Sequence, residues 1–281
     1  MTGDETAALA RDNGTADGTG PLPFDITKAH QARVYNYLLG GKDNYAADRA
    51  AAAEGLKVYP EMAVAARANR AFLGRTVRFL AAEAGIRQFL DIGTGIPTAG
   101  NTHEVAQATA PESRVVYVDY DPIVLAHARA LMTNGGEGGT DYIHADLRDT
   151  GTVLDRAGEL LDFTKPVAIT LLAILHSIQD ADHPYAIVGR LLDAVPSGSY
   201  LALSHVRAES FDAETRSEWE DIIRRTSQQQ YTARTREQVA RFFTGTDLVA
   251  PGVVPLEAWR PEPGTGQPGP WSMWCGVGRK C

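Results

Sequence analysis

Cysteine is scarce in this sequence. Its 281 residues include two cysteines, Cys275 and Cys281, which lie close together near the C-terminus. Two neighbouring cysteines at one end of a chain provide neither a disulfide framework nor the ligand spacing of a metal site. We therefore expect no bound metal, and the simplest location is a reducing cytoplasm.

Long apolar runs and clusters of basic residues are missing as well. The longest apolar run spans residues 167–175, whereas a membrane-spanning helix needs about 20 apolar residues. The N-terminal residues have no basic start followed by an apolar segment, so we expect no signal peptide. Acidic residues outnumber basic ones by 35 to 27, a net charge of -8, which disfavours binding to nucleic-acid phosphates. We expect a cytoplasmic protein that binds neither membranes nor nucleic acids.

The composition pattern divides the chain into three parts. Residues 1–22 are polar and glycine-rich, which is typical of a disordered tail. Residues 23–86 contain two short helical patterns around a Gly-Gly pair and one longer helical pattern, and we expect an N-terminal helical cap. Residues 87–281 form the main domain, with a helical insertion at about 210–243.

Short apolar segments alternate with helical patterns in the main domain, which is typical of a parallel sheet covered on both faces. The expected parallel strands are residues 88–92, 114–120, 141–147, 166–175 and 199–206. Two final apolar segments are joined by a loop rich in proline and glycine, which predicts an antiparallel pair. The predicted fold class is α/β, with a doubly wound, mostly parallel seven-stranded sheet and an antiparallel last strand.

A glycine-containing turn follows the first expected strand, in QFLDIGTGI (residues 88–96). Gly93 and Gly95 allow the backbone to approach a ligand closely, and ligands bind at the carboxyl ends of strands in such sheets. Asp91 precedes the turn, and Thr98 stands where the dinucleotide fingerprint has its third glycine. A carboxylate there would repel a pyrophosphate and attract the ammonium and sulfonium groups of S-adenosylmethionine.

Two more acidic residues follow the next two expected strands. Asp119 ends the second strand and can accept hydrogen bonds from both ribose hydroxyls of an adenosyl ligand. Asp146 follows the third strand and can accept from the adenine amine, while the N–H of Leu147 faces a ring nitrogen. Tyr120 offers a flat surface to the adenine. The alternative for each acid is a structural role as a turn or capping residue.

The chain carries, in order, LDIGTG, VYVDYDP, HADL and an apolar fourth strand. This order resembles the class I S-adenosylmethionine-dependent methyltransferases. More narrowly, the chain is similar to a bacterial S-adenosyl methyltransferase family formerly catalogued as a domain of unknown function. The segments that carry this resemblance are residues 32–49, 88–107, 114–131, 142–149, 171–180, 247–261 and 275–280. The resemblance implies the Rossmann-like class I fold, S-adenosyl-L-methionine as cofactor and methyltransferase activity, but it names no acceptor.

The segment TKAHQARVYNYLLGGKDNYAADR is dense in polar and aromatic residues. We expect it to form a lid that excludes water from the cofactor, with Arg33 as a bidentate partner of the methionine carboxylate. The candidate substrate and lid residues are Tyr37, Lys42, Asp43, Asn44 and Tyr45. The alternative is an amphipathic helix that only packs on the core. With Arg33, the predicted cofactor-binding residues are Asp91, Gly93, Thr94, Gly95, Asp119, Tyr120, Asp146 and Leu147.

Two histidines follow the fourth and fifth strands and are candidates for a catalytic general base, His176 and His205. The alternative is a structural histidine at each strand end, and a metal site formed by His176, Asp180 and His183 is the weakest alternative. Candidates for the acceptor side are Trp219, Gln229, Tyr231 and Trp259, although both tryptophans also suit the core.

The sequence therefore predicts a methyltransferase that acts on a small-molecule acceptor. Methyl transfer from a sulfonium depends mainly on alignment and exclusion of water, so no catalytic triad is required. The tetrapeptide NPPY, typical of enzymes that methylate nucleobase amino groups, is missing. Two alternatives stay open: a nicotinamide-dependent oxidoreductase, and a non-catalytic protein that binds S-adenosylmethionine.

Overall fold

The computed structural model describes residues 25–131, 138–210, 212–227, 231–262 and 273–281. The tail predicted for residues 1–22 and the acceptor candidate Gln229 lie outside the described residues.

Helices precede the sheet in the described part of the chain, namely α1 (Gln31–Leu38), α2 (Ala46–Val58) and α3 (Met62–Ala82). After α1 the chain turns at Gly40, whose φ of 82° glycine adopts without steric conflict. The apolar positions of α3 recur at helical spacing, and Phe72, Val77 and Leu80 are fully buried. The two short helices and the longer one therefore lie where the periodicity predicts them.

The sheet is mostly parallel, as predicted. Its strands are β1 (Gln88–Ile92), β2 (Arg114–Asp119), β3 (Thr140–His144), β4 (Ala168–Leu172), β5 (Tyr200–His205), β6 (Thr246–Leu248), β7 (Val254–Pro255) and β8 (Trp274–Lys280). Their order is β3-β2-β1-β4-β5-β8-β6, a path of seven strands. The two-residue β7 also pairs with β8 and makes an eighth strand beyond the seven predicted. Strand β8 runs antiparallel to β5 and β6.

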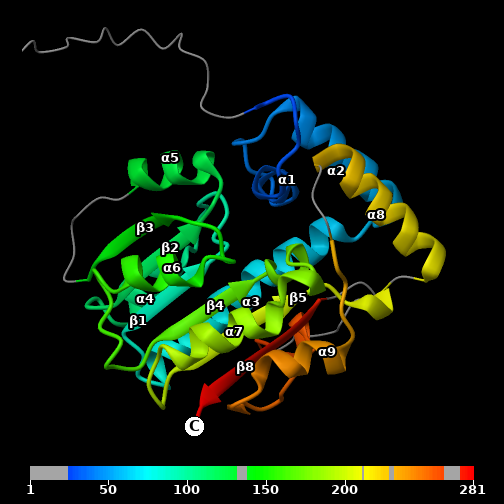
Figure 1. Ribbon diagram of the computed structural model, residues 1–281. Coiled ribbons are helices and arrows are strands. Elements are labelled where there is room, and N and C mark those ends of the chain that lie inside the picture. Colours follow the sequence, from blue (N-terminus) through cyan, green and yellow to red (C-terminus); the bar gives the residue numbers. More distant parts are fainter. Residues whose placement is uncertain (1–24, 132–137, 211, 228–230, 263–272) are drawn as a thin grey trace, which may run out of the picture.

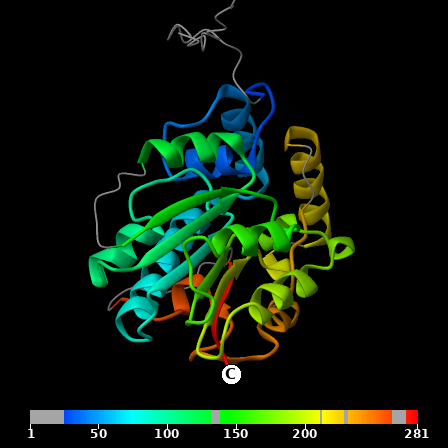
Figure 2. The ribbon, with the colours of Figure 1, turned by 60° about the vertical axis from the view of Figure 1, so that its left-hand side comes forward.

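Helices cover both faces of the sheet (Figures 1 and 2). The helices that follow β1 are α4 (Thr102–Thr109), α5 (Pro122–Leu131), α6 (Thr150–Ala157), α7 (Pro184–Asp193), α8 (Ala213–Ser227) and α9 (Arg236–Ala240). Apolar residues of α3 and α4 pack in one core cluster, and those of α6, α7 and α9 pack in another on the opposite face. Alternating strand residues enter the two clusters, as expected for a sheet buried on both sides.

The fourth strand ends earlier than predicted. Residues 166–175 form one apolar run, but β4 ends at Leu172 because Ala173 adopts a left-handed φ of 54°. The chain then turns into a short 3₁₀ helix, Leu175–Ser177. Residues 173–177 therefore lie at the carboxyl edge of the sheet instead of extending the strand.

Helices α1, α2 and α8 lie together beyond this carboxyl edge (Figure 1). Helix α8 packs along α2, and α1 packs on α2 and α3. Helix α8 of the predicted insertion and the N-terminal helices α1 and α2 therefore form one layer over the strand ends.

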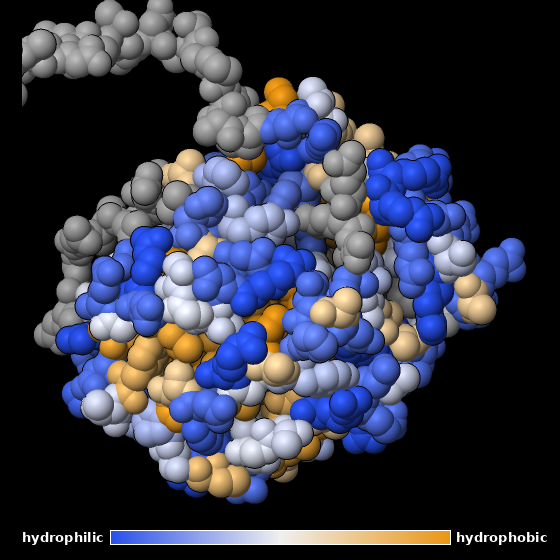
Figure 3. All heavy atoms as spheres, viewed as in Figure 1, coloured by the Kyte–Doolittle hydropathy of each residue, from blue (hydrophilic) through white to orange (hydrophobic). Residues whose placement is uncertain are grey.

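Hydrophilic residues cover most of the face shown in Figure 3, and apolar residues appear in small groups among them. Within the described residues, no helix combines the length and the apolar character that a membrane crossing requires.

Candidate active site

A cavity with an empty volume of about 760 Å³, open solvent at its mouth included, lies along the carboxyl ends of β1, β2 and β4. We call it the sheet-edge cavity. The residues predicted from sequence that line it are Asp91, Gly93, Thr94, Gly95, Asp119 and Tyr120. The topology brings them together because β1 and β2 are parallel neighbours whose carboxyl ends meet at one edge.

Asp91 is fixed in place by two threonine hydroxyls. Its Oδ2 accepts from Thr102 Oγ1 at 2.6 Å, and its Oδ1 accepts from Thr170 Oγ1 at 2.7 Å. Burial raises the pKa of the Asp91 carboxyl, although both hydrogen bonds act in the opposite direction. A buried carboxylate held this way presents negative charge to the cavity, and a cationic ligand beside it would favour the ionised form.

The glycine turn leaves little room for a side chain. Gly93 has a φ of 77°, and a Cβ atom there would lie 2.6 Å from Cγ1 of Ile174. Helix α4 begins only at Thr102, after its N-cap residue Asn101. The glycines are therefore not followed directly by a helix N-terminus, which is the feature that binds pyrophosphate in dinucleotide-binding folds.

Asp119 connects the second strand to the glycine turn. Its Oδ2 accepts from the N–H of Gly95 at 2.8 Å, and its Oδ1 accepts from the N–H of Asp121 at 3.0 Å. Burial raises the pKa of the Asp119 carboxyl. Each carboxylate oxygen has a further lone pair, so the side chain can still accept from two ligand hydroxyls.

Two predicted adenine contacts lie outside the sheet-edge cavity. Asp146 is partly exposed, and its Oδ2 lies 2.8 Å from Nη1 of Arg148. Leu147 is buried in the core cluster on the α6 and α7 face. Asp149 is the N-cap of α6 and accepts from Thr152 N, so Asp146 is not needed as the cap. Both predicted residues follow β3, next to β2 in the sheet.

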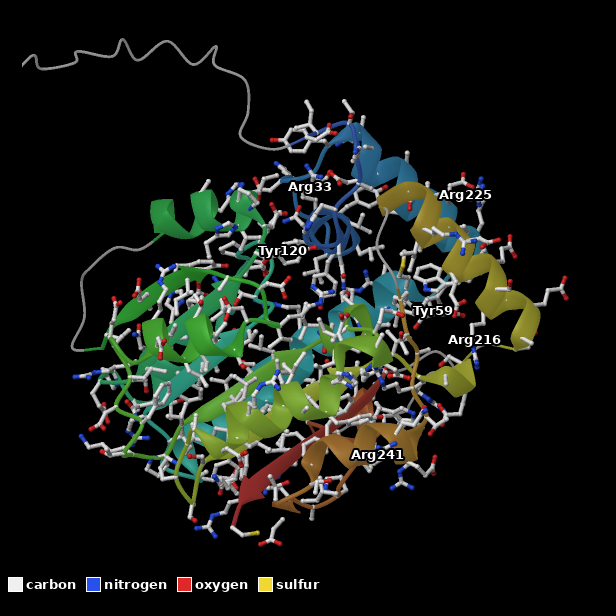
Figure 4. All side chains as sticks on the ribbon, in the orientation of Figure 1. Arg33, Tyr59, Tyr120, Arg216, Arg225 and Arg241 are labelled. Atoms are coloured by element: carbon white, nitrogen blue, oxygen red, sulfur yellow. The ribbon has the colours of Figure 1, made fainter. Side chains whose placement is uncertain are left out.

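The N-terminal segment contacts the sheet edge through His30. Its Nδ1 lies 2.8 Å from Oδ2 of Asp121, and its Nε2 lies 3.1 Å from the hydroxyl of Tyr120. Tyr120 is 45% exposed, and Figure 4 shows it at the sheet edge that faces the N-terminal helices. His30 belongs to the polar and aromatic segment noted in the sequence. Its role at the sheet edge could not be predicted, because its partners lie about 90 residues away in the chain.

The structure does not bring Arg33 to the sheet-edge cavity. Its side chain is buried among the N-terminal helices (Figure 4), where Nε lies 3.2 Å from Oδ1 of Asp48 and Nη2 donates to Lys28 O at 2.6 Å. The arginine that lines the cavity is Arg70 of α3, whose Nη2 donates to Ala99 O at 3.1 Å. Helical spacing alone could not identify it, because the face of α3 that meets the glycine turn depends on tertiary packing.

The other predicted lid residues line neither this cavity nor the one described next; these are Tyr37, Lys42, Asp43, Asn44 and Tyr45. Helix α1 instead presents Gln31, Tyr35 and Leu38, spaced four and three residues apart, to the cavities. Tyr37 lies on its exposed face. Helix α1 of this segment therefore lines both cavities, but through residues other than those predicted.

A second cavity lies between α1, α2, α3 and α8, with an empty volume of about 910 Å³ including open solvent. We call it the helical cavity. Among the residues that line it are Val34, Leu38, Ala51, Tyr59, Trp219 and Ile222. It shares Gln31, Tyr35 and Ala173 with the sheet-edge cavity. The two cavities therefore adjoin. Of the acceptor candidates, Trp219 and Tyr231 line the helical cavity, whereas Trp259 is buried in the core.

His176 lines the helical cavity and is buried. Gln31 bridges it to Ser177: Gln31 Nε2 lies 2.8 Å from His176 Nε2, and Ser177 Oγ donates to Gln31 Oε1 at 2.6 Å. Burial, followed by the positive charge of Arg234, lowers the pKa of His176 to about 3. The imidazole is therefore neutral near pH 7 and a weak base.

His205 is the other predicted base, and it lines neither cavity. Its Nδ1–H donates to Val206 O at 2.9 Å, and its Nε2 accepts from Nη1 of buried Arg234 at 2.9 Å. Both ring nitrogens are thus engaged within the protein, which fits a structural role. Asp180, a member of the alternative metal site, pairs with Arg234 at 2.7 Å. The described residues contain no group of three or more His, Cys, Asp or Glu that could hold a metal ion.

The profile of one protein family, described as S-adenosyl methyltransferase, matches residues 18–281. The chain belongs to this family. Its cofactor is S-adenosyl-L-methionine, which the methyltransferase family uses as methyl donor, and the cofactor predicted from sequence is confirmed. The sheet topology confirms the predicted fold class.

Two solved structures resemble this S-adenosyl methyltransferase over most of its length. A DUF574 family protein from Streptomyces avermitilis MA-4680 is 44% identical, with a TM-score of 0.87 over 92% of this chain and 99% of that one. A protein from Thermobifida fusca YX, described as a candidate methyltransferase, is 42% identical, with a TM-score of 0.83 over 91% and 96% of the two chains. No curated protein matches the chain.

The sheet-edge cavity fits this cofactor chemically. Asp91 offers negative charge to a cationic ligand, and Asp119 keeps acceptor capacity for a ribose. Gly93 shapes a surface that a Cβ atom would obstruct.

Proposed function

We propose that the protein transfers a methyl group from S-adenosyl-L-methionine in the sheet-edge cavity to a small-molecule acceptor in the helical cavity. The observation that carries this proposal is that Gln31, Tyr35 and Ala173 line both cavities. A donor and an acceptor bound on either side of these residues would be neighbours, and in-line transfer requires such proximity.

Each part of the cofactor has a proposed partner. Asp119 accepts from the ribose hydroxyls, and Asp91 stabilises the ammonium and sulfonium charges. Arg70 takes the role first assigned to Arg33 and pairs with the methionine carboxylate, because Arg70 lines the cavity and Arg33 does not. The adenine is proposed to lie toward Asp146 and the N–H of Leu147, which follow the neighbouring strand.

When bound, S-adenosylmethionine supplies an electrophilic methyl group, which forms a bond to an acceptor lone pair as the C–S electron pair returns to sulfur. The chain's contribution is alignment and exclusion of water by α1. His176 does not take up a proton from the acceptor near neutral pH, because its pKa is lowered to about 3. A proton released by the acceptor therefore leaves for solvent.

Incubation with methyl-labelled S-adenosylmethionine and a metabolite extract tests the proposal. We expect label in a low-molecular-mass product that depends on the protein. Saturable cofactor binding with no label in any fraction would contradict methyl transfer and indicate a protein that only binds the cofactor.

Replacing Arg70 by glutamine should weaken cofactor binding about tenfold or more, since a hydrogen bond to a charged group contributes about 1.5–3 kcal/mol. The matched control is Arg67→Gln, which removes an exposed arginine from the same helix.

Arg33→Gln should lower thermal stability, because it leaves Asp48 buried without its ion pair, but it should preserve affinity for the cofactor. Calorimetric titration separates these variants, and weaker binding in Arg33→Gln alone would restore the first assignment.

A further inference from the structure

The helical cavity has an apolar lining. Its walls are aliphatic and aromatic side chains, and none of the described residues that line it is charged. Tyr59 (labelled in Figure 4) and Trp219 meet edge to face there, with ring centroids 6.0 Å apart. A ligand that carries a full charge would lose its hydration in this cavity without gaining a counter-ion. The lining therefore favours an uncharged, largely apolar ligand.

His176 brings a polar atom without a partner to the lining. Nδ1 of His176 is buried and has no hydrogen-bond partner among the described residues. Two other polar groups of the lining are engaged within the protein: Thr226 Oγ1 donates to Ile222 O at 2.8 Å, and Tyr35 donates its hydroxyl to Ala66 O at 3.0 Å. A buried donor or acceptor without a partner is costly, and a polar ligand atom that reached Nδ1 would remove this cost.

The hydrogen bonds around Gln31 fix the tautomer of His176. Ser177 donates to Gln31 Oε1, so the amide nitrogen of Gln31 is the atom that faces His176 Nε2. Nε2 must accept this hydrogen bond, and the neutral ring therefore carries its hydrogen on Nδ1. The unsatisfied atom is a donor, and its ligand partner must be an acceptor such as an oxygen.

The position of His176 determines which end of the ligand it holds. It is bonded to Gln31, which lines both cavities, and follows Ala173, which also lines both. Ala173 is held in its left-handed conformation with its N–H donating to Ser204 Oγ at 2.9 Å. An oxygen bound by His176 therefore lies at the end of the helical cavity that adjoins the cofactor.

We propose that the acceptor is an uncharged, largely apolar small molecule whose hydroxyl or carbonyl oxygen accepts a hydrogen bond from Nδ1–H of His176. This inference rests on the proposed function, since it names the class of substrate for the same site. The apolar part of the acceptor occupies the space between α1, α2 and α8, and its oxygen-bearing end faces the cofactor.

Fluorescence titration of the full chain, saturated with S-adenosylhomocysteine, tests this with three probes: 1-naphthol, 1-naphthoate and 1-methylnaphthalene. We expect 1-naphthol to bind, and the anion 1-naphthoate to bind at least about tenfold more weakly. His176→Phe should weaken 1-naphthol binding about three- to tenfold and leave 1-methylnaphthalene binding unchanged. These comparisons use the wild-type chain and His176→Phe, so they test the inference even if the cavity-filling variant described next does not fold.

Ala51→Phe fills the helical cavity and should prevent 1-naphthol binding while S-adenosylhomocysteine still binds. Ala50→Phe is the matched control, since Ala50 is an exposed neighbour on the same helix. If 1-naphthol does not bind by about 1 mM, or if 1-naphthoate binds equally well, the inference on the acceptor is overturned and the cofactor site stands. Failure of S-adenosylhomocysteine itself to bind would instead contradict the proposed function.

Discussion

Asp119→Asn is expected to weaken S-adenosylmethionine binding about a hundredfold or more, because two hydrogen bonds to a charged group contribute about 1.5–3 kcal/mol each. The wild-type carboxylate accepts from Gly95 N and Asp121 N and keeps lone pairs for the ribose. An asparagine has one acceptor oxygen, so its NH₂ group would face a backbone N–H donor. The variant would thus lose acceptors for the ribose and disturb the glycine turn together. Calorimetric titration measures the loss of affinity.

The matched control for this variant is Asp149→Asn. Asp149 caps α6 near the same edge of the sheet and does not line the sheet-edge cavity. Asparagine is an equally good N-cap, so stability and affinity should both be retained. Equal affinities in the two variants would show that the carboxylate of Asp119 does not hold the cofactor.

Gly93→Ala is expected to abolish measurable cofactor binding and to lower the free energy of unfolding by about 2–4 kcal/mol. Two effects add. Alanine is strained at a φ of 77°, and its Cβ would lie 2.6 Å from Cγ1 of Ile174. Ile174 lines the sheet-edge cavity, so any shift that relieves the clash changes the cavity itself. Chemical denaturation and calorimetric titration measure the two losses.

Gly100→Ala separates the two effects. Gly100 has a similar φ of 76°, but a Cβ atom there has no neighbour within 4 Å. This variant should lose about 1 kcal/mol from backbone strain and should keep its affinity for the cofactor. If Gly93→Ala behaved like Gly100→Ala, the close packing of Gly93 against Ile174 would not determine the shape of the cavity.

The parts of the fold that follow from local pattern could be predicted from the sequence. Strand β1 spans the five residues that its apolar run indicates, and α3 begins where the helical spacing begins. The end of β4 could not be predicted, because the apolar run continues through Ala173 and only the backbone conformation shows the turn. The two-residue β7 was missed because it carries no periodic signal of its own.

The same distinction applies to the candidate site. Asp91 and Asp119 end parallel neighbouring strands, so topology alone brings them to one cavity. Arg70 and Gln31 come from helices, and which face of a helix meets the sheet depends on packing that the sequence does not show. The hydrogen bond between Arg234 and His205 could not be predicted either, because the two residues lie 29 positions apart in the chain.

A crystal structure with bound S-adenosylhomocysteine tests the cofactor site most directly. We predict the ribose hydroxyls on the carboxylate of Asp119, the amino group near Asp91 and the carboxylate at Arg70. A ligand bound elsewhere, with the sheet-edge cavity empty, would contradict the proposed site.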